Sequence, residues 1–267
     1  MAVATLPKFR GQKTEWATPE YGVCPWPSRR FTVAEYHRLA ELEIFHPEEK
    51  CELLEGWITE KNPPPAAWEV EGSIFEADIW PYPIRKFNAD EYHLLIACGF
   101  FGSNPKFELL EGWITPKIPI DPSRSRAVRS LCAWFHQHLG ADWIASVQQP
   151  IRADRSEPEP DITIFPGPES KYDGRHPSGR ETALVIEVAN SSLKRDQEIK
   201  LPVFAANGVS QYWIVNLIDN HVEVYTQPRG GKAPANKSRI DYVKGQEIRL
   251  VLAGKSVGSL PVSEFLA

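Results

Sequence analysis

The chain has 267 residues, of which 42% are hydrophobic and nine are tryptophan, a composition typical of a globular protein and not of a disordered one. The formal net charge is −5, from 30 Lys and Arg against 35 Asp and Glu, so no overall positive field exists that would attract nucleic acid, and such binding would need a local patch. No run of about 18 apolar residues occurs, which argues against a membrane-spanning helix.

The cysteines and the N-terminus indicate the compartment. Cys24, Cys51, Cys98 and Cys132 are far apart, and none belongs to a C-x-x-C pair or lies at zinc-site spacing from a histidine. The first residues lack the apolar core of a signal peptide. We therefore expect reduced thiols and a cytoplasmic protein.

The first third of the chain contains an internal repeat. Residues 25–63 recur without gaps, at an offset of 56, as residues 81–119, and 20 of the 39 aligned positions are identical. This agreement indicates a duplicated segment, although two copies are too few for a solenoid. The Pro-rich, acidic stretch between the copies is interpreted as a linker. The sequence thus predicts an N-terminal arm over residues 1–80 and a main domain over residues 81–267.

Each copy is expected to contain a short helix followed by a strand. Thr32 and Asn88 are helix-capping residues, and each has a glutamate three positions later, which is the pattern of a capping box. The ELLEGW segments alternate as strands do, with Gly56 and Gly112 marking a turn or a bulge.

The next elements are a helix and a strand. Residues 123–139 place apolar side chains at helical spacing and are followed by Gly140, which predicts a helix that faces the core. Residues 143–152 are interpreted as a strand. The Gly- and Pro-rich loop 166–181 is long for a connection, and it either contacts a substrate or is a passive excursion.

Two acids and one amine stand out in the second half of the chain. Asp161 precedes the β-branched and aromatic run 162–165, and Glu187 lies in the nearly continuous hydrophobic run 183–188, as expected of strands covered on both faces. A carboxylate in such a place needs a cation, a donor or a metal, because its desolvation is costly. Lys200 is a plausible partner, so these three residues form the candidate active site.

A helix should follow from Ser191 or Ser192 to about Ala206, with a kink or restart at Pro202, which cannot donate to the carbonyl four residues back. Asp196 and Lys200 lie four apart on one face, and an exposed ion pair is the simplest interpretation.

Residues 211–217 and 221–227 are then expected to form a hairpin, followed by one or two edge strands. Tyr212 and Trp213 are either a base-stacking platform or, as is more common, core aromatics.

Taken in order, the motifs resemble a known family. ELLEG(W)I, an amphipathic helix, Pro160-Asp161 with its strand, LVIEVANSS, D-x-x-x-K and Gly208-Val-x-x-Tyr-Trp-Ile-Val-Asn are similar to the Uma-type putative restriction endonuclease family of the PD-(D/E)xK nuclease superfamily. The resemblance covers about residues 87–227. It implies an α/β fold, namely a restriction-endonuclease-like core with a mixed central sheet flanked by helices. In this chain the duplicated helix-strand extension precedes that core.

The resemblance also implies that Asp161 and Glu187 hold a divalent metal. Two carboxylates on neighbouring strands suit a hard cation such as Mg²⁺, or Mn²⁺, which keeps several waters and contacts phosphate oxygens. One such water can act as the nucleophile, and the Lys200 ammonium can stabilise the charge that builds up on the attacked phosphate.

The sequence departs from the family pattern at two positions. Ala189 stands where the E-x-K signature has its lysine, and the resemblance assigns the amine to Lys200 instead. Arg124 stands where the family usually carries a histidine. Glu108 matches the family's glutamate, which implies a metal-binding or site-shaping role. Arg124 and Lys194 either contribute to a phosphate-binding face or are solvated helix surface.

Three hypotheses follow. The first is a Mg²⁺-dependent DNA endonuclease in which Asp161, Glu187 and Lys200 are catalytic. The second is a catalytically inactive nuclease-like module that binds nucleic acid or a protein partner, in view of Ala189, Arg124 and the acidic net charge. The third treats residues 25–63 as an interaction arm that packs on its own core or on that of a partner in a homodimer.

Overall fold

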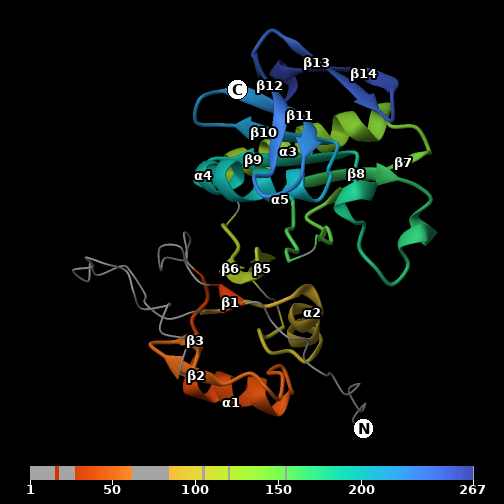
Figure 1. Ribbon diagram of the computed structural model, residues 1–267. Coiled ribbons are helices and arrows are strands. Elements are labelled where there is room, and N and C mark those ends of the chain that lie inside the picture. Colours follow the sequence, from red (N-terminus) through yellow and green to blue (C-terminus); the bar gives the residue numbers. More distant parts are fainter. Residues whose placement is uncertain are drawn as a thin grey trace. The chain divides into compact units, whose positions relative to one another are not determined.

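The computed structural model describes residues 16–17, 28–61, 84–103, 106–119, 121–153 and 155–266, which divide into two compact units, Met1–Pro116 and Lys117–Ala267 (Figure 1). This division differs from the predicted boundary at residue 80, because the second repeat copy packs with the first. The predicted linker, Cys24 and nearly all of the first 24 residues lie outside the described residues. No described helix is long and apolar enough to cross a membrane.

The N-terminal unit contains the same elements twice. The first copy has α1 (Val33–Glu41), β2 (Cys51–Leu54) and β3 (Trp57–Glu60), and the second has α2 (Ala89–Ala97), β5 (Phe107–Leu110) and β6 (Trp113–Pro116). The short strands β1 (Trp16–Ala17) and β4 (Ile84–Arg85) extend the first hairpin into a sheet of order β1-β4-β3-β2.

Local signals explain these elements. Both capping boxes are present, with Thr32 and Asn88 as N-caps and Glu35 and Glu91 as their partners, as predicted. Gly56 has a φ of 82° and follows a residue that also has a positive φ, which gives the turn type that a two-residue hairpin loop prefers. The two glycine signals therefore mark hairpin turns that split each predicted strand in two.

A six-stranded mixed sheet forms the centre of the C-terminal unit. Its order is β12-β11-β10-β9-β8-β7, and among its neighbouring pairs only β9 and β10 run parallel. The strands are β7 (Trp143–Val147), β8 (Ile162–Pro166), β9 (Leu184–Ala189), β10 (Gln211–Asn216), β11 (His221–Arg229) and β12 (Ala235–Val243). The fold is mixed α/β, in agreement with the sequence.

Helices and a hairpin cover the two faces of this sheet. The 17-residue helix α3 (Pro122–His138) and the hairpin β13 (Glu247–Leu252) and β14 (Lys255–Pro261) share one core with the sheet. The opposite face packs on the helical stretch α4 (Leu193–Arg195), η4 (Asp196–Lys200) and α5 (Leu201–Ala206). All six residues of β9 are buried, because this strand is covered on both faces.

Short helical turns complete the unit. They are η2 (Glu169–Tyr172), η3 (Gly179–Glu181) and η5 (Val262–Glu264). The first two break up the long loop 166–181. Trp213 and Tyr212 of β10 are 0% and 1% exposed and belong to the cores on opposite faces of the sheet, so they are core aromatics and not a stacking platform.

The C-terminal core should depend strongly on α3. Leu131 is fully buried there, so Leu131→Ala should lower the free energy of unfolding by about 2–5 kcal/mol. The matched control Ile218→Ala removes apolar atoms from an exposed side chain and should change it by no more than about 0.5 kcal/mol. Urea unfolding followed by circular dichroism measures both; equal effects would contradict this assignment of the core.

Candidate active site

Strand register brings the two predicted carboxylates together. Strands β8 and β9 are neighbours with Ile162 opposite Ile186, so Asp161, just before β8, lies beside Glu187. Side chains alternate along β9: Ile186 and Val188 enter the core shared with α3, whereas Glu187 faces the helical stretch on the other side of the sheet. Both carboxylates are therefore buried, at 1% and 0% exposure.

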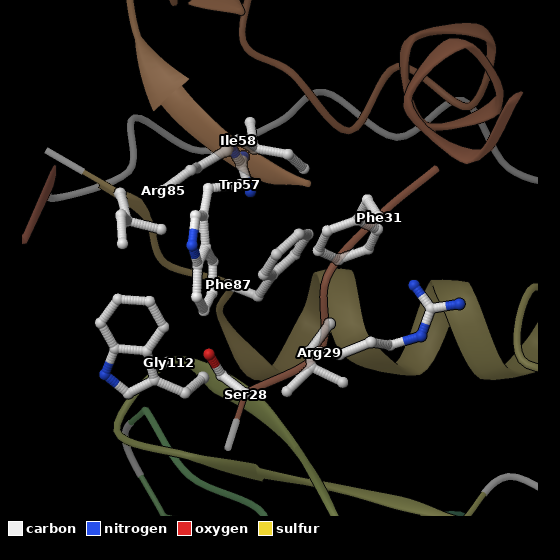
Figure 2. Close-up of a pocket in the computed structure, with 11 residues that line it drawn as sticks. Ser28, Arg29, Phe31, Trp57, Ile58, Arg85, Phe87 and Gly112 are labelled. Carbon is white, nitrogen blue, oxygen red and sulfur yellow. The ribbon is translucent and has the colours of Figure 1, made fainter. Parts of the chain in front are cut away.

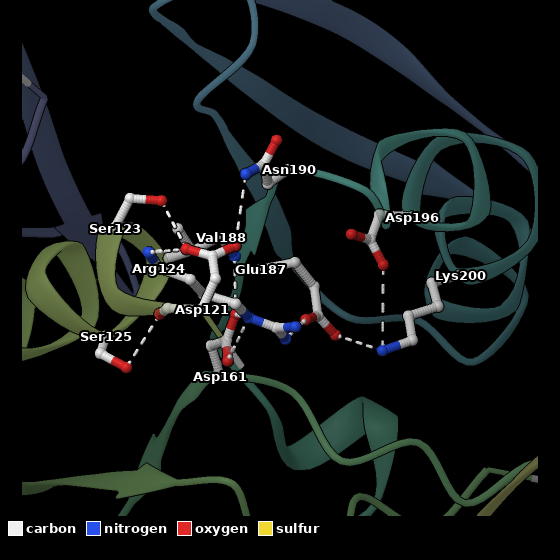
Figure 3. A network of polar contacts seen from close by, with 10 residues as sticks. All are labelled: Asp121, Ser123, Arg124, Ser125, Asp161, Glu187, Val188, Asn190, Asp196 and Lys200. Atoms are coloured by element: carbon white, nitrogen blue, oxygen red, sulfur yellow. Dashed lines mark hydrogen bonds and ion pairs between the residues drawn. The ribbon is translucent and has the colours of Figure 1, made fainter. Parts of the chain in front are cut away.

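The N-terminus of α3 brings a cation to them. Asp121 caps α3 by accepting a hydrogen bond from the Arg124 amide at 2.9 Å, and Asn190, just after β9, donates to the other Asp121 oxygen at 3.2 Å. This contact fixes the start of α3 next to the end of β9. Arg124 is consequently 9% exposed and points between the two acids (Figure 3).

Asp161 is held by three hydrogen bonds. The Nε atom of Arg124 donates to Oδ2 at 2.9 Å and to Oδ1 at 3.1 Å, and the Val188 amide donates to Oδ2 at 2.8 Å. Charge-assisted bonds of this kind are stronger than neutral ones, so the orientation of this carboxylate is well defined.

Glu187 has a less complete environment. Lys200 Nζ donates to its Oε1 at 2.8 Å, while Oε2 lies 3.6 Å from Arg124 Nη2 and has no hydrogen-bond partner in the described part of the chain. Burial raises the pKa of Glu187 to about 8; Lys200 and Arg124 oppose this shift, and the charges of Asp196 and Asp161 add to it. One buried carboxylate oxygen of Glu187 thus has an ion-pair partner but accepts no hydrogen bond within the described residues.

A wide helical turn presents Lys200. The segment Asp196–Lys200 is a π-helix, in which the Leu201 amide donates to the Asp196 carbonyl five residues back. Pro202 explains it, because it has no amide hydrogen for the Glu198 carbonyl and so disfavours a regular α-helical ladder. The predicted irregularity is thus a widening of the turn just before the proline.

Asp196 is a member of the site that the sequence did not assign. The i,i+4 spacing predicts an exposed pair with Lys200, but the two residues are 1% and 3% exposed, and their side chains lie 3.9 Å apart next to Glu187 (Figure 3). Burial raises the pKa of Asp196, and the nearby Lys200 works against this shift. The sequence signal that could have assigned Asp196 to the site is the D-x-x-x-K spacing, which places Asp196 and Lys200 on one face of the helix.

The remaining predicted site residues lie apart from this cluster or in the other unit. Lys194 is on α4 with a 73% exposed side chain, 3.9 Å from Glu198. Glu108 is 2% exposed on β5 of the N-terminal unit, and its metal-binding role stays a prediction. Arg124 is buried against the acids and is not the solvated surface residue that was one of its two interpretations.

The stability of the metal-free protein should depend on Glu187 and pH. Since folding raises its pKa from 4.5 to about 8, its stabilising contribution is full below about pH 4.5 and is lost as the pH rises towards 8. The Glu187→Gln side chain stays neutral at every pH. The free energy of unfolding of this variant, relative to that of the unsubstituted protein, should therefore increase by up to a few kcal/mol as the pH rises from about 5 to about 8.

Urea unfolding in EDTA at both pH values measures this difference. Glu198→Gln, which alters an exposed carboxylate on the same turn, is the control and should show no such trend. A stability difference for Glu187→Gln that is independent of pH would contradict the assigned environment.

The chain is similar to the crystal structure of a putative nuclease belonging to DUF820 from Anabaena variabilis, with a TM-score of 0.48 and 15% sequence identity over 60% of this chain and 88% of that one. No curated protein matches. The family model "Uma2: Putative restriction endonuclease" matches residues 89–252, more than half of the chain, which confirms the resemblance seen in the sequence. The chain therefore belongs to the Uma2 family of putative restriction endonucleases.

Proposed function

We propose that this protein is a metal-dependent endonuclease that hydrolyses phosphodiester bonds in DNA. The observation that carries the proposal is the convergence of Asp161 and Glu187, from neighbouring strands, on one guanidinium, with Lys200 bonded to Glu187 at 2.8 Å. Membership of the nuclease family supports hydrolase chemistry on nucleic acid.

The residues present fit a divalent cation. Asp161 and Glu187 supply hard oxygen donors, which Mg²⁺ and Mn²⁺ prefer. The Oε2 atom of Glu187 is buried without a hydrogen-bond partner in the described part of the chain, and Arg124 Nη2, 3.6 Å away, compensates only partly for its desolvation. When bound, an ion of this kind supplies Lewis acidity towards phosphate oxygens and lowers the pKa of a water ligand.

The other side chains would position these groups. The Val188 amide and Arg124 orient Asp161, and Asp196 constrains the direction of the Lys200 ammonium, which offsets negative charge beside Glu187. Lys194, exposed on α4 at the start of the same helical stretch, is suited to contact a phosphate of the DNA backbone. The free thiols of Cys51, Cys98 and Cys132 support a reducing compartment such as the cytoplasm.

One observation favours a second candidate, a nuclease-like module without turnover. Arg124 bonds Asp161 and approaches Glu187, and Lys200 bonds Glu187, so two internal cations already offset most of the negative charge that a metal would neutralise. Such a module would bind nucleic acid or a protein without hydrolysis. Metal titration and cleavage assays separate the two candidates.

Plasmid cleavage tests the proposed reaction. With Mg²⁺ or Mn²⁺, the protein should convert supercoiled plasmid to relaxed or linear forms. Asp161→Asn should reduce the rate at least about 100-fold, the scale of losing a direct active-site charge interaction. Asp241→Asn, which alters a partly exposed carboxylate on β12 of the same sheet, should leave the rate unchanged. Cleavage by Asp161→Asn at the original rate would reject the proposal, and metal-independent cleavage would reject its metal dependence.

Arg124 should compete with the metal. Arg124→Met keeps a long side chain but removes the charge between the acids, so Mn²⁺ binding followed by calorimetry should become about tenfold tighter. The metal-free variant should also lose about 3–5 kcal/mol of stability, because its buried carboxylates lose a cation. Arg126→Met, at an exposed position of the same helix, is the control for both measurements. Weaker Mn²⁺ binding by Arg124→Met would contradict this competition and leave Arg124 only its role in orienting Asp161.

A further inference from the structure

Equivalent residues of the two repeat copies touch each other. Phe31 and Phe87 occupy the same position in the two copies, and their ring centroids are 5.6 Å apart; Trp57 and Trp113 are likewise equivalent and lie 6.4 Å apart. Figure 2 shows the first pair of rings side by side, with Trp57 next to them. Residues next to a two-fold axis contact their own equivalents, so these two contacts are those expected if the copies pack as two subunits of a symmetric dimer do.

The remaining contacts are reciprocal, as this symmetry requires. Thr59 of β3 pairs with Ile84, the segment just before α2, and Ile114 of β6 accepts a hydrogen bond at 2.7 Å from Arg29, in the segment before α1. Each hairpin therefore pairs with the entry segment of the other copy.

The two equivalent arginines, Arg29 and Arg85, each contact the other copy at the same position. Arg85 donates to the Ile44 carbonyl of the first copy at 3.0 Å. Arg29 lies over the ring of Phe100, which is the equivalent of Ile44 in the second copy, at 5.6 Å. Each arginine also bonds the capping-box glutamate of its own copy, Glu35 or Glu91.

The face between the copies is filled by the copies themselves. Residues of both line a cavity of about 10 Å³, which has room for about one water molecule (Figure 2). Apolar residues of both copies form one continuous core, which includes Phe31, Leu39 and Ile58 of the first copy and Phe87, Leu95 and Ile114 of the second. This is the pattern of an obligate interface and leaves no room for a ligand.

We propose that this face is a self-complementary docking surface for a second copy of the same segment, and that here the first copy occupies the place of a partner chain. The family model begins at residue 89, inside the second copy, so the first copy lies outside the matched region. A chain with a single copy would expose the apolar face and pair through it with another chain. In this protein the internal pairing covers the face, so the face is not available to pair with a second chain.

Three full-length variants test the proposal. The first carries Phe31→Asp and Trp57→Asp, the second carries the equivalent Phe87→Asp and Trp113→Asp, and the third combines all four. A charge in one copy disfavours the internal pair but leaves the other copy with an intact face. Light scattering should therefore give the mass of one chain for the unsubstituted protein, twice that mass for the first and second variants, and one chain for the third.

The masses of these variants can contradict the proposal in several ways. Folded first and second variants that stay at the mass of one chain would show that the face is not self-complementary. An unsubstituted protein at twice the mass of one chain that the combined variant returns to one chain would contradict the proposal, because the face would then pair between chains. Should the substitutions unfold the unit, a protease site inserted between residues 64 and 80 gives a second test. After cleavage the first copy should stay bound at the mass of one chain, or leave while the remainder doubles in mass. A remainder that loses the first copy and stays single contradicts the proposal.

Discussion

The ion-paired burial of Asp161 and Glu187 is the constraint on which the C-terminal unit depends. Two carboxylates at less than 2% exposure cannot remain charged without cations, because their desolvation is too costly. Arg124 from the start of α3 and Lys200 from the π-helical turn meet this requirement. Three local features bring those two cations to the acids: the Asp121 cap, the Asn190 contact and the irregular turn before Pro202.

The same ion pairs also affect the function that we propose. Arg124 and Lys200 offset much of the charge of the acids, so a divalent cation bound as we propose would compete with an internal one. Of the oxygens of Asp161 and Glu187, Oε2 of Glu187 is the one without a hydrogen-bond partner among the residues that the structure describes. In this member of the family, the two buried acids are therefore held in ion pairs with cations of the same chain.

The N-terminal unit is stabilised in a different way. Its stability comes from two similar segments that bury the same apolar face against each other, as shown by the Phe31–Phe87 contact at 5.6 Å. Neither a single helix nor a two-stranded hairpin buries enough apolar surface to be stable alone. The duplication therefore supplies within one chain what a symmetric dimer supplies between two.

The sequence by itself determined the features that depend on neighbouring residues. These include both capping boxes, the buried character of β9, the irregular turn before Pro202, the family and the candidate trio of Asp161, Glu187 and Lys200. Only the tertiary structure decided that the repeat copies share a core, and that Arg124 and Asp196 join the acids. Arg124 and Asp161 are 37 residues apart, and neither local pattern specifies the other. Burial converts Arg124 and Asp196 from surface charges into parts of the site, and burial depends on how distant segments pack.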